Sequence, residues 1–148
     1  MSEHAAELYW KRETDDFTYQ SYDRNHIWKF ENGVELEASA APQYKGDPNK
    51  VDPESAFAAA LSSCHMLTFL ALAAMKKFVV DSYHDRAVAT LDKDSSGNMA
   101  ITRVTLTPRI EFSGDNQPSA EELQELHDQA HHKCFLANSV KCEVTVNC

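Results

Sequence analysis

Two of the four cysteines lie where they could carry out thiol chemistry. Cys64 lies in "LSSCHMLTFL", residues 61–70, within a long apolar helical pattern, and Cys134 ends a second helical pattern on its inward side. A peroxide-reducing enzyme needs such a pair, because one thiolate attacks an O–O bond to give a sulfenic acid and the second thiol condenses with it to a disulfide. Core packing is the alternative for both, since free cysteine is among the most buried residue types.

Attack by Cys64 would require a neighbouring cation. Cys64 lies about three turns into its helix, whereas the dipole of a helix N-terminus activates a thiol only within the first turn. His65 is a poor base for Cys64, because consecutive side chains on a helix diverge by about 100°. A cysteine hydrolase would also need oxyanion donors, and no motif supplies them.

A metal-binding module is a further alternative. His127, His131 and Cys134 are spaced i, i+4 and i+7 on one helical face, and with Cys64 they could form a tetrahedral zinc site. The competing interpretation is a partly solvated polar face, because charged and amide side chains share this helix. With only four glycines and no glycine-rich nucleotide loop, the sequence predicts no cofactor.

The other two cysteines are expected to have no chemical role. Cys142 alternates with Val144 and Val146 on one face of a predicted strand, which indicates core packing. Cys148 is terminal and is expected to be exposed.

Length and composition indicate one soluble domain over residues 1–148. The net charge of −9 excludes a general nucleic-acid binder, which needs a basic face, and disfavours binding to anionic membranes. The segment "MSEHAAELYWKRETDD" has no basic start followed by an apolar run, so we expect no signal peptide and a cytoplasmic location. The apolar run over residues 56–74 contains polar side chains at its centre, which favours a buried helix over a membrane span.

The elements that must position these residues begin with a predicted meander over residues 15–40. The stretch "DDFTYQSYD" places Phe17, Tyr19 and Ser21 on one face, and "HIWKF" and "VELEAS" follow on either side of the turn "ENG". The loop "APQYKGDPNK" then leads to a long helix.

Asp52 is the expected N-cap of this helix, Pro53 fits its first position, and two lysines, at 76 and 77, end it. The helix is apolar nearly all round and should be buried on most sides, which implies that a second subunit covers part of it. One face is predicted to contain Phe57, Leu61, Cys64, Thr68, Ala71 and Met75, and a second apolar row runs through Ala58, Phe69 and Leu72.

The second half of the chain predicts three strands and a helix. Two long strands, "FVVDSYHDRAVATL" and "MAITRVTLTPRIEF", flank the hairpin loop "DKDSSGN". The helix begins near Ser119, which has capping-box spacing to Glu122, and "KCEVTVN" forms the last strand. This order is typical of an α+β fold.

Several of these segments resemble the OsmC/Ohr family of osmotically inducible and organic hydroperoxide resistance proteins. The segments that carry the resemblance are "YDRNHIW", "DPESAFAAALSSCHMLTFLALA", "VVDSYHDRAVATL" and "HHKCFLANSVKCEVTV". Because His65 follows the first cysteine, the chain resembles an OsmC-like branch more than the hydroperoxide resistance proteins proper. The resemblance implies antiparallel sheets wrapped around a long buried helix, in an intertwined homodimer.

The resemblance also implies an activity and its residues. The activity would be a thiol-dependent peroxidase that reduces organic hydroperoxides, and hydrogen peroxide less efficiently. Cys64 would attack the peroxide, Cys134 would resolve the sulfenic acid, and Arg24 would hold the thiolate with Glu54 as its partner. A small dithiol or a thiol protein would reopen the disulfide. A non-catalytic thiol or ligand-binding protein of the same fold stays an alternative.

Two geometric expectations concern the pocket. Phe57, Phe69 and Phe135 could wall an apolar substrate pocket, although their helical spacing suits core packing equally well. Glu54 lies ten residues before Cys64, which is about 15 Å along a continuous helix. We therefore expect Glu54 to reach the Cys64 of the partner subunit, or the helix to be interrupted near Ala58 to Leu61.

Overall fold

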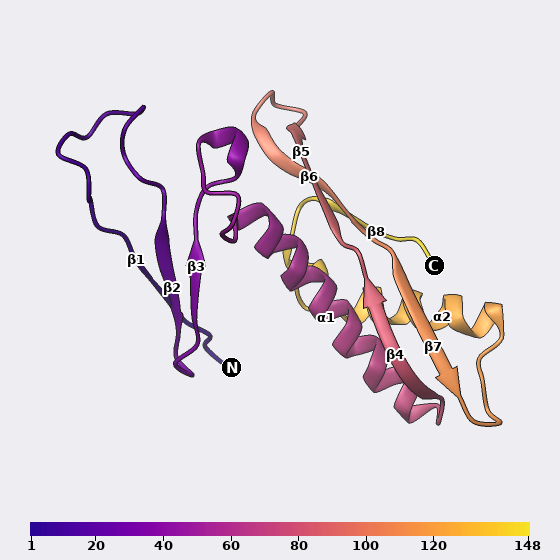
Figure 1. Cartoon of the computed structure of the whole chain (residues 1–148). Coiled ribbons are helices and arrows are strands. Elements are labelled where there is room, and N and C mark those ends of the chain that lie inside the picture. The colour runs from indigo at the N-terminus through magenta and orange to yellow at the C-terminus, as the bar shows by residue number, and fades with distance from the viewer. The chain divides into compact units, whose positions relative to one another are not determined.

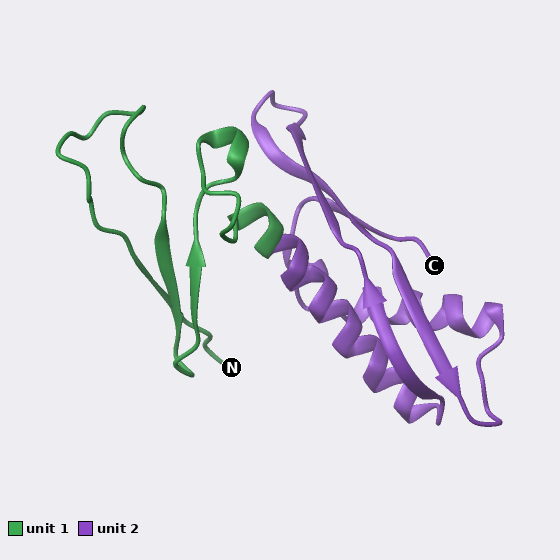
Figure 2. Ribbon diagram, in the orientation of Figure 1, with its two compact units in different colours: residues 1–56 green, residues 57–148 purple.

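Two units make up the chain, Met1–Ala56 and Phe57–Cys148, in a computed structural model that describes residues 1–148 (Figure 1, Figure 2). Together they contain two α-helices and three small sheets, which confirms the predicted α+β class. That the chain is a single domain stays a prediction.

Unit 1 is built on a three-stranded antiparallel sheet in the order β1-β2-β3. The strands are β1 (Ala6–Tyr9), β2 (His26–Phe30) and β3 (Glu35–Ala38). The predicted turn between β2 and β3 closes at Gly33, whose φ of 87° favours glycine. A short 3-10 helix, Pro42–Tyr44, then leads through a bridge between Ala38 and Val51 to the long helix.

The predicted strand over residues 15–23 is wrong, and β1 was missed. Residues around Thr18 form a turn instead, in which the backbone N–H groups of Ser21 and Tyr22 both donate to the Thr18 carbonyl, each at 3.1 Å. The Thr18 and Ser21 hydroxyls lie 2.8 Å apart and bond to each other and to the turn backbone. Such local bonds from hydroxyl side chains compete with strand pairing, although the side chains alternate as in a strand.

Helix α1 (Pro53–Met75) begins as predicted. Asp52 accepts hydrogen bonds from the Ser55 backbone N–H at 2.9 Å and from the Ser55 hydroxyl at 2.7 Å. The helix ends where Lys77 takes a left-handed φ of 62° and the Phe78 N–H donates to the Ala73 carbonyl at 3.0 Å. The helix has no interruption between Ala58 and Leu61, so that alternative of the sequence analysis is wrong.

In unit 2, each of the two predicted long strands is divided. The observed strands are β4 (Val79–Asp85), β5 (Val88–Lys93), β6 (Met99–Leu106) and β7 (Pro108–Ser113). The breaks lie opposite each other, where the Asp85 carboxylate accepts the Thr107 backbone N–H at 2.6 Å and Pro108 has no N–H to donate. The predicted hairpin between β5 and β6 is confirmed.

The C-terminal elements are α2 (Ala120–Lys133) and β8 (Glu143–Val146). Ser119 and Glu122 form the predicted capping box. Strand β8 pairs with β6 in parallel, whereas the other strand pairs are antiparallel as expected. A parallel neighbour requires a long crossover, and here that crossover contains β7 and α2.

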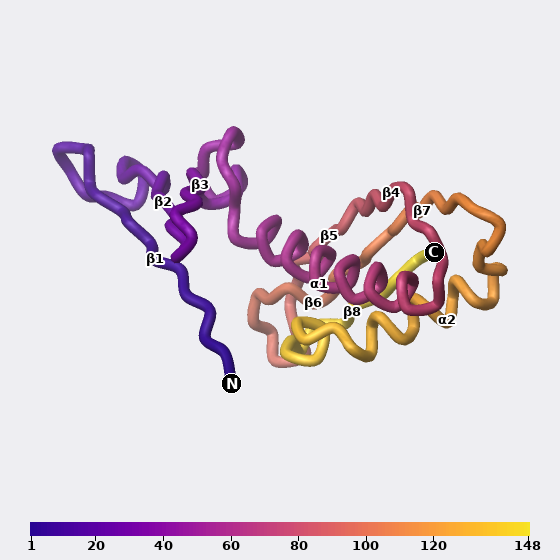
Figure 3. Tube along the Cα trace, turned by 90° about the horizontal axis from the view of Figure 1, so that it is seen from below, coloured from indigo at the N-terminus to yellow at the C-terminus, as the bar shows by residue number.

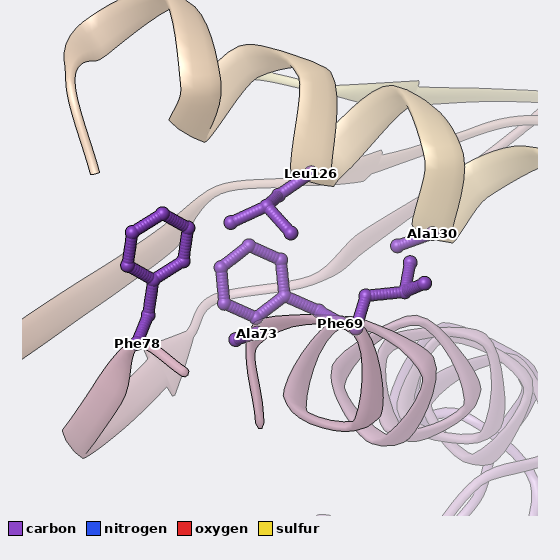
Figure 4. Packing of buried hydrophobic residues seen from close by; sticks show 6 residues of the cluster. Phe69, Ala73, Phe78, Leu126 and Ala130 are labelled. Carbon is purple, nitrogen blue, oxygen red and sulfur yellow. The ribbon is translucent and has the colours of Figure 1, made fainter. Parts of the chain in front are cut away.

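Packing of α2 on α1 forms the main core of unit 2 (Figure 3, Figure 4). In Figure 4, Leu126 and Ala130 of α2 face Phe69 and Ala73 of α1, with Phe78 beside them. Phe69, Ala73, Leu126 and Ala130 are fully buried. This packing holds the two helices side by side.

The buried face of α1 follows the second predicted apolar row, through Ala58, Phe69 and Leu72, more closely than the first. Its buried residues are Ala58, Leu61, His65, Phe69, Leu72 and Ala73. Met75 on the predicted face is 75% exposed within the chain, and Leu67 is 61% exposed. By length and composition α1 could cross a membrane, but its packing identifies it as a core helix.

Shortening the central side chain of this core should destabilise unit 2. Phe69→Leu is expected to lower the free energy of unfolding by about 1–2 kcal/mol, because a buried ring is replaced by a smaller side chain. Urea unfolding of the purified protein measures the change. Phe135→Leu is the matched control, because Phe135 is 82% exposed and should change stability by less than about 0.5 kcal/mol.

Candidate active site

Cys64 and Cys134 meet between α1 and α2. Their Sγ atoms lie 2.8 Å apart, with the Cys134 thiol donating to the Cys64 sulfur, and neither forms a disulfide. This separation exceeds the length of an S–S bond, about 2.05 Å, by less than 1 Å, so little movement would be needed to join them. Cys64 is half-buried, whereas Cys134 is buried.

Cys134 is held firmly at the end of α2. Its N–H donates to the His131 carbonyl at 3.3 Å, its carbonyl accepts the Asn138 N–H at 3.1 Å, and the Ala137 N–H points at its Sγ from 3.4 Å. Burial, and then the hydrogen bond to Cys64, raise the pKa of Cys134. Cys134 therefore stays a thiol, and Cys64 is the sulfur that a reactant can approach.

A buried histidine pair joins the same two helices. His65 Nε2 and His127 Nδ1 are 3.0 Å apart, and each residue is 1% exposed. The ring of Phe69 stacks on His127 with centroids 4.5 Å apart. One imidazole must donate and the other accept, so the bond requires at least one neutral ring and is lost when both rings are protonated.

The sequence analysis does not find this pair, because it treats His127 as a possible metal ligand or as part of a partly solvated face, and His65 only as a base for Cys64. A usable signal existed. His127 lies four residues after Leu123 and three before Ala130, so it belongs to the apolar stripe of α2 that faces α1.

Burial keeps both rings neutral near pH 7. Burial, and then the positive charge that His127 and His131 would carry, lower the pKa of His65 to about 4, against an opposing effect of Asp85. Burial also lowers the pKa of His127, although Asp128 and Asp85 oppose it. The hydroxyl group of Tyr83, a residue of β4, has no hydrogen-bond partner.

This burial predicts an acid-sensitive fold. The unfolded chain protonates His65 below about pH 6.5. The folded chain protonates His65 only below about pH 4. The unfolded state therefore binds more protons between these values, so the stability is complete above pH 6.5 and falls as the pH falls toward 4. The loss from His65 should approach about 3 kcal/mol.

Urea unfolding at several pH values tests this prediction. His65→Gln removes the titrating group, so its stability should depend less steeply on pH between 6.5 and 4 than that of the wild type. Equal slopes for the two proteins would contradict the assignment.

Arg24 is fixed within unit 1 by its own loop. Its guanidinium donates to the carbonyls of Tyr22 at 2.5 Å and Tyr19 at 2.6 Å, and it lies 3.7 Å from the centre of the Tyr22 ring. It forms no ion pair with Glu54 within one chain, and the expected pairing of the two side chains stays a prediction. Glu54 instead leaves its Oε2 without a hydrogen-bond partner.

Arg24 lines an apolar cavity of about 480 Å³ in unit 1. The cavity is lined by Leu8, Trp10, Phe17, Tyr22, Arg24, His26, Ser39, Ala40 and Pro53. It is a concave, mostly apolar space with one cation, which are properties typical of a site for a small organic ligand. The sequence analysis singled out Arg24 but not the aromatic residues around it.

The three phenylalanines considered for a substrate pocket differ in their surroundings. Phe69 is fully buried in the core of unit 2, and Phe57 packs on the cluster formed by Leu61 and Val104. Phe135 is 82% exposed after the end of α2. Within the chain Phe69 serves packing, as the core alternative predicts, and a substrate-binding role for these residues stays a prediction.

The metal alternative finds no support in the geometry. No group of three or more His, Cys, Asp or Glu side chains could hold a metal ion. His127 turns Nδ1 to His65, and Cys134 turns its sulfur to Cys64, so the i, i+4, i+7 set does not converge on one point. Cys142 packs on the second cluster and Cys148 is exposed, both as predicted.

The sequence model of the OsmC-like protein family matches residues 46–148. The chain belongs to the OsmC-like family. The resemblance found in the sequence is thereby confirmed, and the matched region contains both cysteines and the histidine pair. No functionally curated protein matches the chain.

Solved structures of OsmC-like proteins share this fold. An OsmC-like protein of unknown function from Vibrio cholerae is 45% identical, with a TM-score of 0.97 and coverage of 99% of both chains. An organic hydroperoxide resistance protein from Elizabethkingia anophelis is 21% identical, with a TM-score of 0.74 and coverage of 99% of this chain and 96% of that one. The organic hydroperoxide resistance protein OhrB of Bacillus subtilis is 19% identical, with a TM-score of 0.71 and coverage of 99% and 97%.

Proposed function

We propose that this OsmC-like protein is a cytoplasmic, homodimeric thiol peroxidase that reduces organic hydroperoxides, and hydrogen peroxide less efficiently. The observation that carries the proposal is the pair of free thiols 2.8 Å apart, one half-exposed and the other buried and protonated. Membership in a family that includes organic hydroperoxide resistance proteins supports it.

The proposed reaction proceeds in three balanced steps. The Cys64 thiolate attacks one oxygen of the hydroperoxide, the O–O bond breaks, and the alcohol leaves with a proton while Cys64 becomes a sulfenic acid. The Cys134 thiol then attacks the sulfenic sulfur, which forms the disulfide and releases water. A small dithiol or a thiol protein finally reduces the disulfide and is itself oxidised.

Arg24 and Glu54 are proposed to assist the first step. A guanidinium stabilises a thiolate and offers donors to a peroxide oxygen. Because α1 is unbroken, the position of Glu54 favours a role toward Cys64 of the partner subunit in the proposed dimer. The apolar cavity that Arg24 lines supports a preference for organic hydroperoxides over hydrogen peroxide.

A ligand-binding protein without catalysis is the second candidate. The observation that favours it is the same cavity of about 480 Å³, which suits a small organic ligand and is lined by no cysteine. A protein of this kind would bind an apolar molecule and leave its thiols unchanged when peroxide is added.

A single-turnover experiment separates the two candidates. One equivalent of cumene hydroperoxide should consume two thiols per chain, and peptide mapping should find a Cys64–Cys134 disulfide. With dihydrolipoamide as reductant, kcat/KM should be higher for cumene hydroperoxide than for hydrogen peroxide. Unchanged thiols after exposure to either peroxide would overturn the proposal and favour the ligand-binding candidate.

A further inference from the structure

We propose that the His65–His127 hydrogen bond is a positioning device that holds Cys134 against Cys64. It rests on the proposed function only for its catalytic consequence, because the equilibrium between thiols and disulfide can be measured without peroxide. The two histidines are positioning residues, since no contact joins either ring to a sulfur atom.

The placement of the four side chains is the basis of this inference. Cys64 and His65 are consecutive on α1, whereas Cys134, the C-cap of α2, follows His127 by seven residues, about two turns. The same two helices are thus joined at two points, by Sγ atoms 2.8 Å apart and by ring nitrogens 3.0 Å apart. Two contacts about 10 Å apart along α2 oppose both its rotation and its sliding against α1.

The histidine contact is suited to fixing geometry, because it is directional and lies in a closed environment. Both rings are 1% exposed, so their hydrogen bond is shielded from competition with bulk water. Phe69 of α1 stacks on His127 at 4.5 Å and limits its rotation. The neighbouring apolar contacts, Leu126 and Ala130 on Phe69, hold the helices together but do not select one register as a hydrogen bond does.

The other polar groups near the two histidines are either bonded elsewhere or unpaired, so the specific polar contact of the pair is the His65–His127 hydrogen bond. Asp85, on β4, is occupied by the Ser62 hydroxyl and the Thr107 N–H. His127 Nε2 and His131 Nδ1 have no hydrogen-bond partner, and both residues line a small cavity of about 190 Å³ beside β8. Without His65, His127 would therefore have no hydrogen-bond partner for either ring nitrogen.

The catalytic consequence concerns the second step of the proposed reaction. Condensation of the Cys64 sulfenic acid with the Cys134 thiol releases water, and its rate depends on how much of the time the two sulfur atoms are within reach. Loss of the histidine bond should slow this step and weaken the disulfide. It should leave the attack of Cys64 on peroxide unchanged.

The test is the equilibrium constant for forming the Cys64–Cys134 disulfide in a glutathione redox buffer, without peroxide, in a Cys142→Ser, Cys148→Ser background. His127→Leu should lower this constant about tenfold, because the net contribution of one buried hydrogen bond is lost and its partner is left unsatisfied. His65→Gln should stay within about twofold of the wild type, because the glutamine Nε2 can occupy the position of the histidine Nε2.

The matched control is Phe78→Leu, which alters the same core at a residue whose ring packs edge-on against Phe112. It should lower the stability yet leave the equilibrium constant within about twofold, because the constant describes the folded state only. His65→Leu breaks the same bond from α1 and replaces His127→Leu if that variant does not fold, with the same tenfold decrease required.

An unchanged equilibrium constant in the leucine variants would overturn the positioning role. So would an equal decrease in Phe78→Leu, because general loosening of the core would then be the cause. Failure of the proposed function is a separate outcome. In that case the wild-type protein would not consume peroxide, although the redox-buffer equilibrium would still respond to the loss of the histidine bond.

Discussion

Cys64→Ser is expected to lower turnover with cumene hydroperoxide and dihydrolipoamide at least about a thousandfold, because a serine hydroxyl cannot replace the sulfur that attacks the O–O bond. The variant should fold like the wild type, since Cys64 is half-buried and the two side chains have similar size. Consumption of hydroperoxide under steady-state conditions measures the effect.

Cys142→Ser is the matched control for this substitution. Cys142 is also half-buried, and it packs on the cluster around Leu61 and Val104 rather than on the dithiol. Its turnover should stay within about twofold of the wild type, because nothing that it contacts takes part in the reaction. If Cys64→Ser retains the wild-type rate, another residue must be the nucleophile and the proposed reaction is wrong.

Parts of the fold in which local pattern and tertiary contact agree could be predicted from the sequence. The cap at Asp52, the capping box of Ser119 and Glu122, and the hairpin between β5 and β6 depend on short-range chemistry that the sequence shows directly. The prediction that Cys64 and Cys134 lie opposite each other rests on the inward positions of both residues on two helices and on the family resemblance.

Other parts depend on contacts that a linear pattern does not show. The break between β4 and β5 depends on Asp85, whose carboxylate takes an N–H from a residue 22 positions away. The turn at Thr18 replaces a strand, because its hydroxyl and that of Ser21 bond to the nearby backbone. In both cases a polar side chain satisfies a backbone group that strand pairing would otherwise satisfy.

The histidine pair shows the same limit at the candidate site. A histidine in an apolar stripe is ambiguous until its partner on the second helix is known, and His65 and His127 are 62 residues apart in the sequence. Arg24 and Glu54 are identified in the sequence by residue type and motif, and their catalytic roles stay predictions.

The two cysteines of the dithiol differ in their surroundings, and this difference suits different roles in the proposed reaction. Cys134 is buried, its pKa is raised, and three contacts with the backbone fix its position. Cys64, in contrast, retains exposed surface. Because Cys134 is buried, its thiol is protected from direct oxidation by peroxide. It nevertheless lies 2.8 Å from the Cys64 sulfur, which peroxide can reach. This arrangement favours rapid resolution over rapid reaction at both sulfur atoms.

In the proposed reaction, Cys134→Ser should therefore lose its activity through oxidation of Cys64 after the first turnover. Without the resolving thiol, the Cys64 sulfenic acid persists and a second peroxide oxidises it to the sulfinic or sulfonic acid, a gain of two or three oxygen atoms in total. Steady-state turnover should fall at least about a hundredfold, because an oriented intramolecular thiol is replaced by a dilute external one. Intact-protein mass spectrometry during turnover measures the oxygen gain.

The control is Cys148→Ser, because Cys148 is exposed and its sulfur contacts only Gln124, at 3.0 Å. It should keep the wild-type rate and gain no oxygen at Cys64. The first turnover distinguishes the two steps, since Cys134→Ser should still consume one equivalent of peroxide at the wild-type rate when only attack is measured. Sustained turnover of Cys134→Ser without oxidation of Cys64 would show that the buried thiol is not the resolving residue, and that its 2.8 Å contact serves packing alone.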